Sequence, residues 1–121
     1  MQGELALLGN VIRELVLHPA QEIAACQSLA DSVYVAMHHA GLSQESLADK
    51  VAVTPSYLSL ILADKRKCPA RLVLDIVRET KSAAPLQWMN AQVGAEVYLD
   101  PVAVKRAQLT RELAALDARA A

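Results

Sequence analysis

Residues that stop helices divide this chain into pieces of about one helix each. They recur every 14 to 22 residues and include all five prolines: Pro19, Gly41, Pro55, Pro69, Pro85 and Pro101. Proline cannot continue a helix and glycine commonly ends one. Between them, Ala and Leu, two of the strongest helix formers, supply 40 of the 121 residues. This pattern favours short helices, so we expect a compact all-α bundle of five to seven helices.

The remaining composition excludes other classes of protein. With 54% hydrophobic residues and a formal charge of -1, the chain has neither the low hydrophobicity nor the high net charge of a disordered protein. Aromatic residues make only 3% and there are four glycines, which disfavours a β-sandwich or barrel. At 121 residues, one compact domain is expected.

Hydrophobic spacing places a helix in each piece. Leu5, Leu8, Ile12 and Leu15 share one face of a helix over residues 4–17, which ends before Pro19. A second helix is expected over 20–40, with Gly41 as its stop. The later pieces begin with caps or prolines and predict helices over 43–51, 55–63, 69–80, 85–94 and 101–118, with Ser43, Thr54 and Asp100 as caps.

The last of these helices carries a short seam of apolar residues. Leu109, Leu113, Leu116 and Ala120 are spaced by four, three and four, as in a coiled coil. The seam either packs on the chain's own core or forms a dimer interface. We therefore divide the chain into an N-terminal helix at 1–19, a central domain at 20–95 and a C-terminal helix at 96–121, with one or both outer helices assigned to dimerisation.

Residues 42–63 hold two short helices joined by a tight turn. Small Ala48 on the first helix allows the second to approach closely, and Leu47, Val53, Leu58 and Ile61 fill the space around them. A longer helix precedes the pair and an apolar helix follows it. This organisation is that of a helix-turn-helix.

The segment resembles the helix-turn-helix domains of the phage repressor and Cro type, also called the xenobiotic-response-element (XRE) family, over about residues 22–94. The residues that carry the resemblance are Gln44, Leu47, Ala48, Val53, Thr54, Leu58, Ser59, Ile61, the loop 64–67, Leu72, Ile76 and Val77. It implies a lambda-repressor-like domain of phage, prophage or bacterial origin that binds operator DNA as a homodimer, with repression the commoner mode. Gln44 would contact a phosphate; alternatively it is a polar first-turn residue.

The chain departs from the family pattern in two places. Ala52 occupies the inter-helix turn, where the family commonly has glycine because a positive φ is needed. The second helix of the pair, the recognition helix, contains no Arg, Lys, Asn or Gln, so bidentate reading of bases is not available from it. Its outward candidates are Thr54, Pro55, Ser56, Tyr57, Ser59 and Leu60, which would use hydroxyl contacts, apolar contacts with thymine methyls, water or DNA shape.

Charge is distributed unevenly along the chain. Residues 1–40 carry four acidic residues against Arg13, whereas residues 63–71 carry Lys65, Arg66, Lys67 and Arg71 against Asp64 alone. Lys65, Arg66 and Lys67 directly follow the recognition helix, where phosphate contacts are needed. Alternatively they form a solvated loop, because cations favour the C-terminal end of a helix dipole. Tyr57 likewise either donates to a phosphate or packs half-buried on the adjoining helix.

Two function classes remain. The first is a sequence-specific DNA-binding transcriptional regulator, more repressor than activator, acting as a homodimer on double-stranded DNA. The second is a helical protein–protein interaction module that has lost DNA binding. We expect no enzymatic activity, metal, cofactor or small-molecule ligand. The sequence contains no paired nucleophile and base, no phosphate-binding loop and no metal-ligand spacing, and Cys26 and Cys68 do not form such a pair. The N-terminus lacks a signal peptide's basic region and no membrane span is expected, so the predicted location is the cytoplasm.

Overall fold

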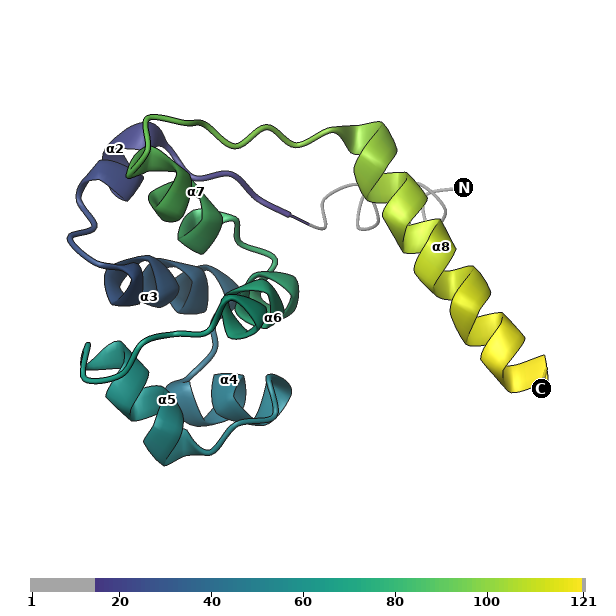
Figure 1. Ribbon diagram of the computed structural model, residues 1–121, viewed down its shortest axis with the longest axis horizontal. Coiled ribbons are helices and arrows are strands. Elements are labelled where there is room, and N and C mark those ends of the chain that lie inside the picture. Colours follow the sequence, from purple (N-terminus) through teal and green to yellow (C-terminus); the bar gives the residue numbers. More distant parts are fainter. Residues whose placement is uncertain (1–14, 121) are drawn as a thin grey trace. The chain divides into compact units, whose positions relative to one another are not determined.

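The computed structural model describes residues 15–120 and shows seven α-helices and no strand within that range (Figure 1). The expected all-α architecture is confirmed. The helices are α2 (Ala20–Ala24), α3 (Leu29–Ala40), α4 (Gln44–Lys50), α5 (Pro55–Leu62), α6 (Ala70–Thr80), α7 (Ala84–Ala91) and α8 (Pro101–Ala120).

The chain separates into two compact units by its internal contacts. Residues 15–97 form one, with α2 to α7, and α8 belongs to the other. Within the first unit, α2 and α7 lie on one side of α3, and α4 and α5 lie on the other (Figure 1). None of the helices in the described range combines the length and apolar character that a bilayer crossing requires.

The predicted caps define the ends of the central helices. Ser43 and Thr54 are extended, and their hydroxyls accept from the backbone N–H groups of Ser46 and Tyr57 at 3.1 Å each. Gly41 ends α3 with φ +67°. These caps satisfy backbone groups that a helix end leaves unpaired, so α4 and α5 begin, and α3 ends, where the sequence predicts.

The predicted single helix over 20–40 is wrong, because the chain breaks into α2 and α3 between residues 25 and 28. Ser28 is extended and its hydroxyl accepts from Asp31 N–H at 3.3 Å, while Asp31 Oδ2 accepts from Gln27 N–H at 2.8 Å. This reciprocal capping replaces helical hydrogen bonds. In addition, Trp88 Nε1 of α7 donates to the freed carbonyl of Cys26 at 3.2 Å. Helical periodicity alone does not reveal either contact.

The predicted helix over 4–17 is also wrong at its described end, residues 15–17; residues 4–14 lie outside the described range. Val16 forms an isolated parallel bridge with Ser82, donating to Lys81 O at 2.8 Å and accepting from Ala83 N–H at 2.9 Å. These hydrogen bonds to main-chain groups between α6 and α7 hold residues 15–17 in a non-helical conformation. The compact unit consequently begins at Leu15, before the boundary at residue 20 that the sequence suggested.

The helix expected over 85–94 runs over Ala84–Ala91 instead. Beyond Ala91, Val93 and Gly94 donate to carbonyls three residues earlier, at 3.1 and 3.2 Å, and Gly94 takes a φ of +72°. Bonds of this i to i+3 type tighten the chain into turns rather than α-helix.

One hydrophobic core holds α3 to α6 together. Its fully buried members include Val33 of α3, Leu47 and Ala48 of α4, Leu58 of α5 and Ile76 of α6. Ala48 has no exposed surface, and Leu47 and Leu58 are equally buried, so α4 and α5 lie in close contact as the small residue predicts. This core fixes the position of α5, whose opposite face is the surface considered next.

Candidate nucleic-acid interface

The turn between α4 and α5 is held by two backbone hydrogen bonds. Ala52 has φ +58°, its N–H donates to Asp49 O at 3.2 Å, and Val53 N–H donates to Ala48 O at 3.0 Å. This pair of bonds is the Schellman motif, in which the left-handed position is usually glycine. The positive φ expected at the inter-helix turn is therefore present, and an alanine adopts it.

We predict that Ala52→Gly raises the free energy of unfolding by about 1 kcal/mol, because glycine adopts a positive φ without the Cβ clash. Gly41→Ala should lower it by a similar amount, since Gly41 holds φ +67° in an equivalent motif and nothing lies within 4 Å of the added Cβ. Urea denaturation of both variants measures the two changes in the free energy of unfolding. A loss of stability in Ala52→Gly would show that the turn carries no conformational strain.

The two faces of α5 differ sharply in exposure. Leu58, Ile61 and Leu62 are buried, whereas the sequence-predicted contacts are mostly open to solvent. Those classed as exposed are Thr54, Pro55, Ser56, Ser59 and Leu60, the last at 41% of its surface. Ser56, Ser59 and Leu60 share the outer face, because residues three and four apart lie together on a helix. The hydroxyl of Thr54 already accepts from Tyr57 N–H, so it retains its own O–H for donation and one further lone pair.

A further Schellman motif directs the chain into the basic loop. Asp64 takes φ +59° and donates to Ile61 O at 3.0 Å, and Lys65 N–H donates to Leu60 O at 2.9 Å. The side chains of Lys65, Arg66 and Lys67 are all exposed. The motif therefore holds three cations directly beside the C-terminal end of α5.

Tyr57 connects the basic loop to the core. Its ring is half-buried against the hydrophobic core, and the Arg66 guanidinium carbon lies 5.6 Å from the ring centroid. A cation over an aromatic face is attracted by the ring quadrupole. The ring of Tyr57 thus packs half-buried, as one of its two interpretations predicted, and it holds Arg66 close to α5.

Gln44 lies at the start of α4 and is half-buried. Its Nε2 donates to the hydroxyl of Tyr34 on α3 at 3.3 Å, and Tyr34 is 44% exposed. Sequence reasoning missed Tyr34, which is ten residues earlier in the chain. The available signal was an aromatic residue at a helix position outside the apolar face formed by Val33 and Met37.

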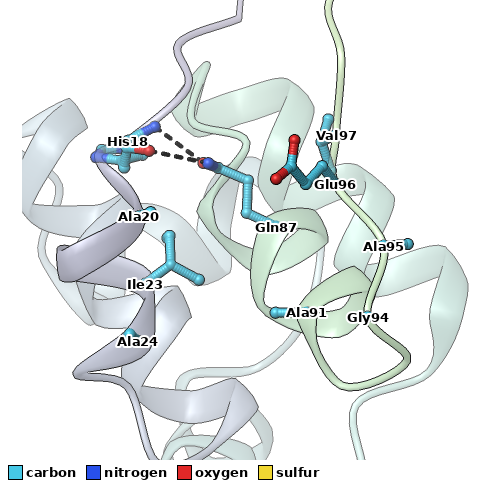
Figure 2. A pocket seen from close by; sticks show the side chains of 10 residues that line it. All are labelled: His18, Ala20, Ile23, Ala24, Gln87, Ala91, Gly94, Ala95, Glu96 and Val97. Atoms are coloured by element: carbon cyan, nitrogen blue, oxygen red, sulfur yellow. Dashed lines mark hydrogen bonds between the residues drawn. The ribbon is translucent and has the colours of Figure 1, made fainter.

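The surface of residues 15–97 is hollowed in places, and two of these hollows border the helices discussed above. One, of about 450 Å³, lies between the start of α3, the loop 64–68 and Trp88, and Arg66 and Lys67 line it. The other, of about 500 Å³, lies between α2, α7 and residues 94–97 (Figure 2). In the second, the Gln87 carboxamide bonds both main-chain groups of His18, at 2.9 and 3.0 Å, and His18 Nε2 lies 2.7 Å from Ser82 Oγ. These polar groups therefore stabilise the fold by bonding to one another.

The two cysteines are free and half-buried. Burial raises the pKa of Cys68 to about 11. Burial, together with the nearby carboxylates of Asp31 and Glu22, also raises the pKa of Cys26. Both thiols are therefore held in the protonated form near neutral pH, which is the opposite of what a thiolate nucleophile or metal ligand needs. Among residues 15–120, no three His, Cys, Asp or Glu side chains gather as metal ligands do.

Comparisons of this chain with protein families, curated proteins and solved structures found no match. The resemblance to phage-repressor-type domains accordingly rests on the chain's own residues, with Gln44, Ala48 and Val53 among them. What those residues form is a helix pair with a fixed turn, an exposed outer face and three adjacent cations.

Proposed function

We propose that this protein is a sequence-specific DNA-binding regulator of transcription, a repressor rather than an activator, which binds operator DNA as a homodimer in the cytoplasm. The observation that supports it best is the juxtaposition of the exposed outer face of α5 with Lys65, Arg66 and Lys67. A helix presented in the major groove needs phosphate contacts beside it to fix its register. In this arrangement the loop supplies those contacts and the helix face supplies the base contacts.

Tyr34 and Gln44 extend the proposed contact surface beyond α5. Gln44 lies at the start of α4, where unpaired backbone N–H groups favour an anion. Because Gln44 Nε2 donates to the Tyr34 hydroxyl, that hydroxyl keeps its own proton available for a phosphate oxygen. Together they form a second backbone contact at the opposite end of the helix pair from the basic loop.

The proposal is tested by titrating generic duplex DNA at two or more salt concentrations. Non-specific affinity should fall linearly with salt on logarithmic axes, because cations release condensed counterions from the phosphates. Absence of salt-dependent binding at micromolar protein in low salt would favour the second candidate, a helical interaction module. That candidate is motivated by the outer face of α5, which offers hydroxyls and the exposed Leu60 but no amide or cationic side chain.

Base selection is assigned to the hydroxyls on the outer face of α5. We predict that Ser56→Ala or Ser59→Ala changes the preferred operator sequence, by about 1–3 kcal/mol at the affected base pair, with the salt slope unchanged. Selection of bound sequences from a random duplex pool, followed by salt titration, measures both quantities. Ser46→Ala on α4, whose hydroxyl bonds Ser43, serves as the matched control. Unaltered preferences in both α5 variants would shift specificity to DNA shape.

A further inference from the structure

Helix α8 carries an apolar stripe that its own described surroundings leave uncovered. Val102, Leu109, Leu113 and Leu116 expose 63%, 46%, 62% and 56% of their surfaces. From Leu109 to Ala120 every residue is exposed. Leucines on one face of a helix are normally buried against another element, and long helices in water owe most of their stability to such packing. The C-terminal half of α8 therefore has the chemistry of an interface.

The stripe follows a heptad repeat. Val102, Leu109 and Leu116 occupy one core position, and Arg106, Leu113 and Ala120 occupy the other. Lys105, Glu112 and Arg119 flank the seam on one side, and Asp117 lies on the other. A parallel pair would stack Arg106 on its copy and place Glu112 against Asp117. Like charges at these positions are unfavourable, so the pattern disfavours parallel pairing.

An antiparallel pair of α8 helices shifted by one heptad places apolar residues together in the core and opposite charges together at its flanks. Leu113 then faces Leu116 of the second copy, Leu109 faces Ala120, and Glu112 faces Arg119, each contact occurring twice by symmetry. Complete antiparallel overlap would instead oppose Lys105 to Arg119, and Glu112 to its copy. A shift in the other direction would place Arg106 in the core. No salt bridge within the described range engages Glu112 or Arg119, so both are available.

We propose that α8 pairs antiparallel with α8 of a second copy of this chain through residues 109–120. The proposal deepens the proposed function, on which its biological role rests, by assigning the homodimer to one surface. Three leucines from each copy make a small interface, so a dimer of roughly micromolar affinity is expected. Such a dimer assembles more completely when both copies bind adjacent half-sites.

The test is sedimentation of the full chain without DNA, at about 1 to 200 µM, a range that brackets a micromolar dissociation constant. Leu113→Asp should weaken dimerisation by at least about tenfold, because it places a charge in the core of the seam. Ala114→Asp adds the same charge one residue further on, outside the seam, and should leave dimerisation unchanged. Glu112→Arg and Arg119→Glu should each weaken the dimer, and the double variant should restore it.

Three outcomes overturn the proposal: a monomer at all concentrations, a dimer indifferent to Leu113→Asp, or no restoration by the double reversal. A monomer that melts at lower temperature with Leu113→Asp would show that another part of the same chain covers the stripe, and a dimer seen only with an added protein would identify a different partner. Because the assay contains no DNA, it separates two failures. A monomer with salt-dependent DNA binding overturns this interface alone, and an α8 dimer without DNA binding overturns the proposed regulator alone.

Discussion

Replacing Lys65, Arg66 and Lys67 together by alanine should reduce the logarithmic salt slope of DNA binding by about three per protomer. Each cation that neutralises a phosphate releases condensed counterions, so at 0.1 M salt the triple variant should bind about 10²- to 10³-fold more weakly per protomer. The loss should be similar for all sequences, because phosphate contacts carry no base information. Fluorescence anisotropy with labelled duplexes over a salt series measures the slope and the affinity together.

Arg78→Ala provides a control of matched charge for the single variant Arg66→Ala. Arg78 lies on α6 and pairs with Asp75 at 3.3 Å, away from α5. Its removal should leave the slope unchanged, whereas removal of Arg66 should lower it by about one. Equal slopes in the triple variant and the unmutated protein would instead make the loop a solvated helix end, and would remove the main support for DNA binding.

Leu58→Ala should lower the free energy of unfolding by about 3 kcal/mol, within the 2–5 kcal/mol range typical of buried leucines. Leu58 has no exposed surface and packs in the core that joins α3 to α6. Its removal forfeits transfer free energy and leaves a cavity beneath α5. The shift in the urea midpoint at unchanged m-value measures the loss.

Leu60→Ala makes the same chemical change two residues later on the outer face of α5. Because Leu60 is 41% exposed, its removal should change stability by less than about 1 kcal/mol. Under the proposed function it should weaken binding to operators with thymine at the contacted position. Equal destabilisation by Leu58→Ala and Leu60→Ala would contradict the assignment of the inner and outer faces.

Local signals in the sequence were sufficient for most helix boundaries. Ser43 and Thr54 cap α4 and α5, and Gly41 ends α3, because caps act on neighbouring backbone groups within a few residues. The positive φ at Ala52 was also expected, from the resemblance of the turn to others of its type. In each case the chemistry that fixes the conformation lies within the local segment.

Two of the wrong predictions involve contacts between residues far apart in the chain, whereas the early end of α7 is set by local turns. Residues 15–17 are extended because Val16 pairs with the backbone beside Ser82. The break before α3 is capped locally by Ser28 and Asp31, but the carbonyl it exposes is satisfied by Trp88, 62 positions away. Hydrophobic periodicity shows which residues are apolar, but it does not show which backbone groups form hydrogen bonds with distant parts of the chain. Helical spacing was therefore overridden by tertiary hydrogen bonds.

The candidate site divides in the same way. Exposure along α5 follows from helical spacing, so the outward positions of Ser56, Ser59 and Leu60 were predictable. Tyr34 was not, because its contact with Gln44 depends on how α3 crosses the start of α4. The roles of these residues toward DNA remain predictions.

The position of Arg66 over Tyr57 also affects the entropy of complex formation. A free arginine on a surface loop samples many rotamers, and immobilising it on a phosphate costs roughly 0.5–1.5 kcal/mol. A guanidinium that already rests on a packed ring has given up part of that freedom during folding. The ring of Tyr57 thereby preorganises the neighbouring loop for the phosphate contact proposed above.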